Sequence, residues 1–279
     1  MLIPGIAALM LALLERTARF QFRSSTLFRR FFTSDMIYLL TGFVAGGSLG
    51  AAYVATASQS VGQLGLSRVA AFNLPLWVTV PLALVAIDLG NYAAHLLLHR
   101  SSVLWEFHKV HHSSHQLDWL ATFRSHLIEQ TLRRLLAPVL LVLTGFPANA
   151  VALAGGIFIA WAVCNHSNLR LNLSFLEPVL ITPRLHRLHH VPATENRNFG
   201  TIFTFWDRLR GVLVIAETGS ECRFGVAGEI DTYPQGWFVQ LIEPVRRIVR
   251  PRSLPARHLT QSVRQEAEAM TAVRAATRE

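Results

Sequence analysis

Charged residues are scarce in this chain of 279 residues. Aspartate, glutamate, lysine and arginine together make up 15% of it, whereas hydrophobic residues make up 51% and the mean hydropathy is +0.34. A soluble domain usually has about a quarter of its residues charged. The composition therefore indicates a membrane protein, and the length allows one large domain or two smaller ones.

Lysine is nearly absent as well, because Lys109 is the only one and arginine carries almost all of the net charge of +9. No recognised nucleic-acid-binding motif accompanies this charge. We attribute the charge to membrane topology and expect no nucleic-acid partner. A bias of arginine over lysine is typical of a GC-rich genome, and on that basis we place the protein in a bacterial inner membrane.

Cysteine is also rare. Cys164 and Cys222 are the only two, and their spacing fits neither a disulfide framework nor a cysteine metal site. We therefore expect the ligand-rich part of the chain to face a reducing compartment, the cytoplasm.

Four apolar stretches interrupt the sequence, at 2–15, 36–57, 74–98 and 135–165. The first is shorter than the roughly 20 residues that a spanning helix needs, so we expect a shallow membrane helix there. The last is broken at 145–147 by Gly-Phe-Pro into a hairpin. The predicted fold is all-α: an integral membrane bundle of about four helices or hairpins with a cytoplasmic helical cap.

The arginine-rich segment that follows the first apolar stretch is cytoplasmic by the positive-inside rule. Alternation across the membrane then places 100–134, and the chain beyond the hairpin, on the same side. We predict three regions: N-terminal membrane helices at 1–73, a catalytic domain at 74–215, and a cytoplasmic C-terminal region at 216–279. The tail from about residue 251 is expected to be disordered.

Histidine is the residue that the chain has in excess, since 11 of its 12 histidines fall between positions 95 and 190. Nine of these 11 form an HxxxH pair, two HxxHH clusters and a histidine in the motif NHSN: His95 and His99; His108, His111 and His112; His186, His189 and His190; and His166. Residues three and four apart share one face of a helix, so each cluster projects its imidazoles to one side.

Three such helices brought together would form a cage of imidazoles. Imidazole suits zinc, copper, iron and nickel, and eight or nine imidazoles are too many for one four-coordinate zinc ion. The spacing therefore predicts a site for two metal ions. A histidine-rich storage tract is disfavoured, because such tracts are disordered runs whereas these clusters lie within apolar and aromatic sequence.

Several polar residues could support this site. Asp88 and Tyr92 share a helical face with His95 and His99, and an ionisable residue inside a span is a candidate functional residue. Asp88 is either a hydrogen-bond acceptor that orients one of those histidines or an interfacial residue that meets water. His126 is expected to act in a support network or polar wall with its neighbours Arg124 and Glu129.

The chain resembles the fatty acid hydroxylase superfamily, which includes the sterol desaturases. The resemblance runs from about Asp88 to Gly211 and rests on seven motifs in order: HLLLH (95–99), HKVHH (108–112), FRSHLIE (123–129), NHSN (165–168), HRLHH (186–190), NRNFG (196–200) and FWDRLRG (205–211). Two positions depart from the family pattern, since Leu127 stands in place of a proline and Arg210 in place of a phenylalanine.

The resemblance implies a di-iron centre with nine histidine ligands: His95, His99, His108, His111, His112, His166, His186, His189 and His190. It also implies an O₂-dependent oxidoreductase that hydroxylates or desaturates a C–H bond of a lipid, with Asn168 of NHSN as a supporting residue. The sequence has no dinucleotide fingerprint and no iron–sulfur cysteine set. Electrons are therefore expected from a separate ferredoxin- or cytochrome-type protein.

Other functions stay open at this point. The same centre could cleave the ether bond of an alkylglycerol. A membrane zinc hydrolase is disfavoured because no HExxH motif is present. A metal transporter is disfavoured because its ligands would line a path across the bilayer, whereas these collect at one face.

Overall fold

The computed structural model describes most of the chain. The described residues are 2–24, 28–42, 56, 63, 74–216 and 222–250. Within them the chain forms helices and turns, with two isolated β-bridges and no strand, so the predicted all-α class is confirmed for this part. The tail predicted to be disordered lies outside the described residues.

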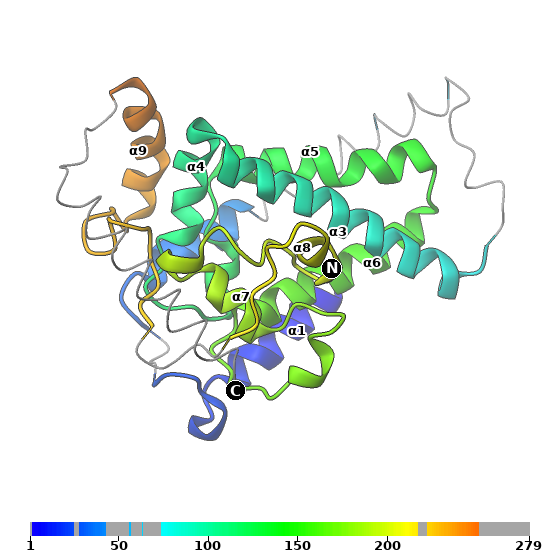
Figure 1. The fold of residues 1–279 in the computed structure, drawn as a ribbon, viewed down its shortest axis with the longest axis horizontal. Coiled ribbons are helices and arrows are strands. Elements are labelled where there is room, and N and C mark those ends of the chain that lie inside the picture. The colour runs from blue at the N-terminus through cyan, green and yellow to red at the C-terminus, as the bar shows by residue number, and fades with distance from the viewer. Residues whose placement is uncertain are drawn as a thin grey trace.

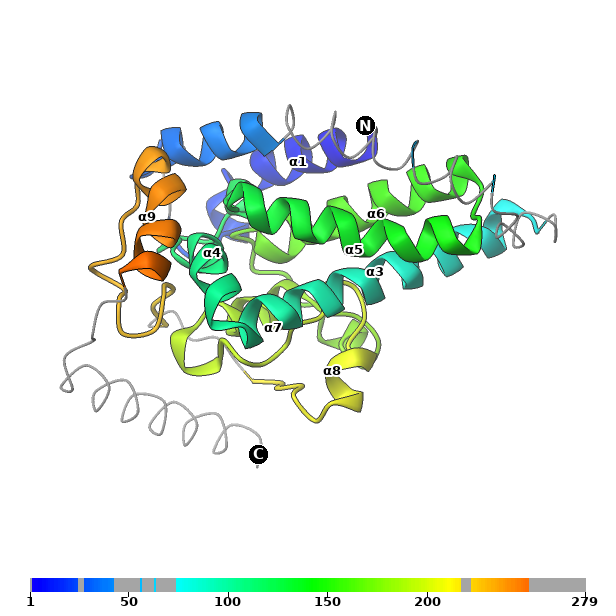
Figure 2. The same cartoon turned by 90° about the horizontal axis from the view of Figure 1, so that it is seen from above.

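Four helices form the elongated body of the molecule (Figures 1 and 2): α1 (Leu2–Leu14), α3 (Leu76–Arg100), α5 (Leu127–Thr144) and α6 (Ala148–His166). α3 packs against both α5 and α6, and α1 packs along α6. Their shared apolar core contains Ala83, Ile87, Leu141 and Ala154, all of which are buried.

Two of the described helices, α3 and α6, are long and apolar enough to cross a membrane. α1 is apolar but has 13 residues, fewer than the roughly 20 that a crossing needs, as expected for the stretch 2–15. Of the predicted span at 36–57, the structure describes helix over 32–42, and most of the remainder lies outside the described residues.

The predicted hairpin is present. α5 ends at Thr144 and α6 begins at Ala148, with Gly145 at a φ of +69° that an L side chain would rarely adopt. Pro147 precedes the first turn of α6, where its missing N–H costs no helical hydrogen bond. The first arm is longer than its apolar stretch, because α5 already begins at Leu127.

Short elements form a cap around the C-terminal ends of α3 and α6. In chain order they are η1 (Ala18–Phe20), α4 (Ser102–His112), η3 (Trp119–Phe123), η4 (Ser174–Leu176), α7 (Pro183–His189), η5 (Pro192–Thr194), α8 (Phe205–Leu209) and α9 (Trp237–Val249). In Figure 2, α4, α7 and α9 lie toward the C-terminal end of α3, whereas α8 lies alongside its central part.

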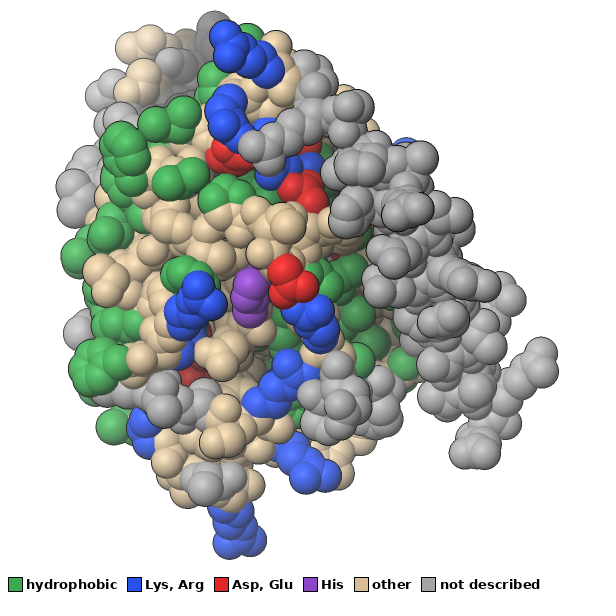
Figure 3. Space-filling model, turned by 90° about the vertical axis from the view of Figure 1, so that its left-hand side faces the viewer, with side chains coloured by type: hydrophobic (Ala, Val, Ile, Leu, Met, Phe, Trp, Pro, Cys, Tyr) green, Lys and Arg blue, Asp and Glu red, His purple; other side chains and the backbone are tan. Residues whose placement is uncertain are grey.

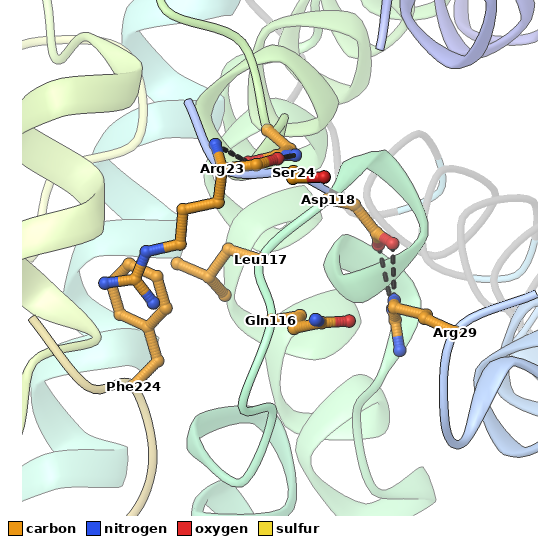
Figure 4. Close-up of a pocket in the computed structure, with 8 residues that line it drawn as sticks. Arg23, Ser24, Arg29, Gln116, Leu117, Asp118 and Phe224 are labelled. Carbon is orange, nitrogen blue, oxygen red and sulfur yellow. Dashed lines mark hydrogen bonds and ion pairs between the residues drawn. The ribbon is translucent and has the colours of Figure 1, made fainter. Parts of the chain in front are cut away.

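A buried ion-pair network ties the N-terminal segment to the cap. The guanidinium of Arg29 contacts Asp118 at 2.5 and 2.8 Å (Figure 4) and Asp35 at 2.6 Å. Asp35 also accepts from Arg124 Nε at 2.5 Å, and Asp35 is fully buried. Two arginines from different segments therefore share one carboxylate away from solvent.

α9 packs against α4 with its polar side. Gln240 is buried and donates to the hydroxyl of Ser113 at 2.8 Å, and it accepts from the Tyr38 hydroxyl at 3.0 Å. Arg247 pairs with Glu243 and Glu229. Figure 3 shows this end of the molecule, where basic side chains are spread over the face and several lie beside acidic ones.

We predict that Asp35→Ala destabilises the fold strongly, because it leaves two buried guanidinium groups without their shared carboxylate. Removing one partner of a buried ion pair costs about 3–5 kcal/mol. Thermal unfolding in detergent should show a clearly lower midpoint. Asp231→Ala is the control, since Asp231 pairs with Arg223 on the surface and should leave the midpoint unchanged. Equal midpoints for the two variants would contradict the structural role of the network.

Candidate metal centre

Ser101 brings the first two histidine clusters together. It ends α3, and its hydroxyl accepts from Leu104 N at 3.3 Å to cap the start of α4. A serine at this position satisfies one of the free N–H groups of the new helix. The chain thus turns sharply after His99, and the HKVHH cluster at the end of α4 folds back over the last turns of α3.

The remaining histidines come from two other elements. His166 is the last residue of α6, and the HRLHH cluster lies on α7, which begins at Pro183 and ends at His189. A proline in the first turn fits a helix start. His190 occupies the C-cap position with helical backbone angles, so it keeps the spacing of the cluster.

The structure brings all nine predicted ligand histidines into two adjoining groups, in each of which one nitrogen per ring lies within 4.8 Å of the others. The first group is His95, His99, His108, His112 and His189, and the second is His111, His166, His186 and His190. The groups adjoin, because the ring centroids of His112 and His190 are 4.7 Å apart. Their role as ligands remains a prediction.

Each HxxHH cluster divides between the two groups. On α4, His108 and His112 belong to the first group and His111 to the second. α7 shows the reverse division, with one histidine in the first group and two in the second. The sequence expectation of one cluster facing one side is thus incomplete, because neighbouring histidines at the end of a cluster point to different groups.

In the second group, two nitrogens that carry lone pairs face each other. His111 Nδ1 bonds the Arg124 carbonyl at 3.0 Å, and His166 Nδ1 bonds the Ala162 carbonyl at 2.9 Å. A carbonyl oxygen only accepts, so the proton of each neutral ring must be on Nδ1. The two Nε2 atoms are then unprotonated and 3.2 Å apart, a contact that only a cation between them makes favourable.

The first group shows the same outward bonding. Nδ1 of His95 donates to the Phe199 carbonyl at 2.8 Å, and Nδ1 of His189 donates to the Arg197 carbonyl at 2.8 Å. His108 Nδ1 lies 2.9 Å from the Glu129 carboxylate. In all three rings, Nε2 is buried and has no hydrogen-bond partner among the described residues. Metal-binding histidines are oriented in this manner.

The spacing of the nitrogens also fits an ion. His166 Nε2 lies 3.0 Å from His186 Nε2, which lies 3.2 Å from His190 Nε2. Two nitrogens bound to one ion at 2.0–2.1 Å, with right-angle to tetrahedral geometry, are about 2.9–3.4 Å apart. The histidine groups therefore fit transition-metal ions that prefer imidazole nitrogen.

Burial keeps the cap histidines uncharged. It lowers the pKa of His111 to about 3 and that of His189 to about 3, and it lowers the pKa values of His108, His112, His186 and His190 well below their usual range. A metal ligand must be the neutral imidazole. No proton therefore has to leave these rings before a cation binds at neutral pH.

The NRNFG motif forms the loop that orients His95 and His189. Asn198, with a φ of +52°, stands between the two accepting carbonyls, and its side chain bonds Leu185 O and Val214 O. Asp207 accepts from the backbone N–H groups of Phe199 and Gly200 at 2.9 and 2.8 Å. A Cβ on Gly200 would come within 2.7 Å of a backbone oxygen, so only glycine fits there.

Asp88 binds this loop and contacts neither of the histidines that the sequence suggested as its partners. Its buried carboxylate accepts from the backbone N–H groups of Ile202 and Phe203 and from the Trp206 indole at 2.9 Å. Since Asp88 is 0% exposed, the alternative prediction that it is an interfacial residue in contact with water is wrong too. Tyr92, on the same helical face, is buried and packs edge-on against the ring of Phe199.

His126 and Asn168 lie outside both groups. His126 bonds Leu241 O of α9 and accepts from Ile128 N at the start of α5. It thus joins two helices, and its contacts are not with Arg124 or Glu129. Asn168 makes paired hydrogen bonds with the backbone of Arg23. It therefore anchors the N-terminal segment.

Glu129 is a residue whose contact with the site the sequence did not reveal. Besides His108, its Oε1 accepts from Arg133 Nε at 2.9 Å, and Arg133 also donates to Asn91 Oδ1 at 2.8 Å. Asn91 in turn donates to the hydroxyl of Thr201. The sequence placed Glu129 in a support network or polar wall with His126 and Arg124, which gave no indication of its contact with His108 on α4.

The region of the chain that matches known proteins is the region that contains the histidine motifs. Residues 80–212 match the family model described as fatty acid hydroxylase. The chain is 33% identical over 175 residues to an ornithine lipid hydroxylase of Rhizobium tropici, a match that covers 62% of this chain and 52% of that protein. No solved structure matches.

Two further relatives carry other activities in their names. An alkylglycerol monooxygenase of Danio rerio is 28% identical, over 58% of this chain and 35% of that protein. A Delta(7)-sterol 5(6)-desaturase of Aspergillus fumigatus is 28% identical, over 50% of this chain and 40% of that protein. The chain thus spans about half the length, or less, of these relatives.

We predict that Glu129→Gln weakens metal binding about 10–100-fold, the usual effect of losing a carboxylate that supports a ligand histidine. Glutamine keeps the size of the side chain but removes the charge beside His108 Nδ1. The metal retained per chain during titration with a chelator measures the effect. Glu106→Gln is the matched control, since Glu106 lies on the same helix as His108 and pairs with Lys109. Identical metal-retention curves for both variants would contradict the role assigned to Glu129.

Proposed function

Because residues 80–212 belong to the fatty acid hydroxylase family, we propose that this protein is a membrane-bound, iron- and O₂-dependent oxidoreductase that acts on a C–H bond of a lipid. The observation that carries the proposal is the set of nine imidazoles whose nitrogens converge in two adjoining groups. Four of these rings have Nδ1 hydrogen-bonded to an outward carbonyl, and the Nδ1 atom of His108 lies beside the Glu129 carboxylate, which leaves Nε2 for an ion.

Each group would hold one iron ion, five histidines for the first ion and four for the second. Bound iron would supply the redox chemistry with O₂, using electrons from an outside donor, that attack on an unactivated C–H bond needs. All-histidine ligation distinguishes this site from soluble carboxylate-bridged di-iron bundles.

The chain's own part is to position the rings and keep water away. The ring of Phe199 packs against His95, His99 and His189, and Trp105 packs against His99 and His112. These aromatic rings lie against the histidines of the first group. Exclusion of water protects a reactive centre from side reactions.

The proposed substrate is a membrane lipid, for two reasons. α3 and α6 are apolar enough to lie in a bilayer, and both carry their group histidines at their C-terminal ends. The relatives named above act on lipids according to their names. Hydroxylation is the preferred reaction, since the relative with the highest identity of the three is a hydroxylase. Desaturation is the variant suggested by the sterol relative.

Ether cleavage of an alkylglycerol is the second candidate, because alkylglycerol monooxygenases from three vertebrates match 54–58% of this chain. The histidine groups serve both reactions equally. The two reactions differ in the lipid that each would consume.

The proposal places the histidine groups on the cytoplasmic side of a bacterial inner membrane, as the arginine-rich segment after α1 suggests. The electrons would come from a separate ferredoxin- or cytochrome-type protein. The reason is chemical: the sequence has neither a dinucleotide fingerprint nor an iron–sulfur cysteine set of its own.

We predict that His111→Ala abolishes activity and lowers iron per chain, because it removes one of the four nitrogens of the second group. Elemental analysis of protein purified without chelators or metal-affinity resin measures the metal, with about two irons expected in the unchanged chain. His115→Ala is the control: His115 lies outside both groups and bonds the Ile230 carbonyl. Full iron and activity in His111→Ala would contradict the assignment, and zinc without iron would favour a hydrolase.

Lipid analysis separates the two candidate reactions. We expect membranes of cells that express the chain to gain a lipid with one additional oxygen atom, compared with cells that express His111→Ala. Loss of alkylglycerol ethers, with release of an aldehyde, would instead establish ether cleavage. A lipid profile that is the same in both strains would contradict lipid oxidation under the conditions of growth.

A further inference from the structure

Four large apolar side chains form an exposed patch on the cap. Phe175 is 74% exposed, Val179 59%, Phe205 48% and Leu209 70%. Phe175 lies in η4, Val179 lies in the turn that follows it, and Phe205 and Leu209 lie in α8. The two segments are joined because Thr204 N donates to Val179 O at 3.0 Å. We call these four residues the η4–α8 patch. Exposed apolar patches of this kind mark binding surfaces.

Hydrogen bonds fix the height of this patch along α3. Trp206 donates to Asp88, which lies about 18 Å along the helix from its last residue, Arg100. A bilayer core of about 30 Å takes about 20 residues, and 20 residues counted from Leu76 reach His95. Taking α3 as a membrane helix, which rests on the proposed function, Asp88 lies within that depth. Figure 2 shows α8 beside the central part of α3.

A contact with α6 independently places the segment before Ile181 on the same side of the histidine groups. The indole of Trp161 donates to Ile181 O at 2.8 Å, and Trp161 lies five residues before the end of α6 at His166. Ile181 directly follows the segment that carries Phe175 and Val179. The patch is therefore level with residues inside both candidate spans, on the membrane side of the histidine groups.

The charges around the patch suit a phospholipid surface. Arg208 and Arg210 are exposed on either side of Leu209. The acids of the two segments are not available to repel phosphate: Glu177 is buried and paired with Arg184, and Asp207 is buried against the NRNFG loop. Apolar side chains flanked by arginines are typical of segments that rest in the lipid interface.

We propose that the η4–α8 patch inserts into the bilayer leaflet nearest the histidine groups, with the long side chains of Arg208, which also bonds the Pro178 carbonyl, and Arg210 extended toward the lipid phosphates. The inserted patch fixes the depth of the cap in the membrane, because its four apolar side chains lie among the acyl chains. Arg210, one of the two departures from the family pattern, thereby gains a binding role.

Spin-label accessibility in lipid nanodiscs tests the proposal. Single cysteines replace Leu209, Phe175, Asp231 or Val85 in a full-length Cys164→Ala, Cys222→Ala background. Collision with O₂, which partitions into lipid, is compared with collision with a water-soluble nickel chelate. Asp231 is the matched control, because its side chain is 71% exposed on a polar part of the cap. Val85, 39% exposed on α3, reports the span itself.

We expect labels at Leu209 and Phe175 to favour O₂, as at Val85, and the label at Asp231 to favour nickel. Labels at Leu209 and Phe175 that match Asp231, with Val85 in lipid, would overturn the proposal and leave the proposed function intact. A label at Val85 that favours nickel would instead show that α3 does not lie in the membrane, which would contradict both this proposal and the proposed function. Dipolar broadening between Phe175 labels of two chains would assign the patch to a protein–protein contact and overturn the proposal.

The arginines are tested with lipid charge. The label at Leu209 should lie deeper in discs that contain phosphatidylglycerol than in discs of phosphatidylcholine alone, and Arg210→Gln should reduce that difference. Arg223→Gln, on the part of the cap that carries Asp231, is the control and should leave the difference unchanged. Equal depth in both lipids would overturn the phosphate contact.

Discussion

The central constraint on the structure is that unprotonated imidazole nitrogens, which repel each other, face each other in a buried space. Neutral rings are imposed by burial, which lowers the pKa of His111 to about 3. Outward acceptors then fix the proton on Nδ1, and the Nε2 atoms of His111 and His166 meet at 3.2 Å. Without a cation this arrangement opposes folding, since buried polar atoms without partners are costly. A bound metal would convert the same atoms into ligands, and its binding energy would then stabilise the cap.

The irregular parts of the fold are the parts that orient the rings. Main-chain carbonyls of Arg124, Arg197 and Phe199 each accept from one histidine Nδ1. A backbone carbonyl is a dependable acceptor only if its loop is rigid. Asp88 and Asp207 provide the rigidity, because each takes up two backbone N–H groups of the loop after α7. These two acids therefore stabilise the loop that orients His95 and His189.

Helical spacing in the sequence predicted the helices that carry histidines, and Gly145 and Pro147 predicted the break in the hairpin. The nine histidines of the cage were found from spacing and family resemblance, and the structure brings them together. What spacing could not give was the division of each HxxHH cluster between two groups. That division depends on which neighbours each ring meets. The partner of Asp88 was mispredicted for the same reason, because Ile202 lies 114 positions away.

α3 serves as an apolar helix and as part of the candidate metal centre, and this double use sets where a lipid could meet the ions. If about 20 residues from Leu76 fill the hydrocarbon, His95 lies at its boundary and His99 one turn beyond it. The part of a phospholipid or alkylglycerol at that depth is the junction of headgroup and chain. Hydroxylation near a headgroup and cleavage of an ether bond therefore need the same placement of the lipid. Under the proposed function, the choice between them would rest on which atom of the lipid lies nearest to the histidine groups.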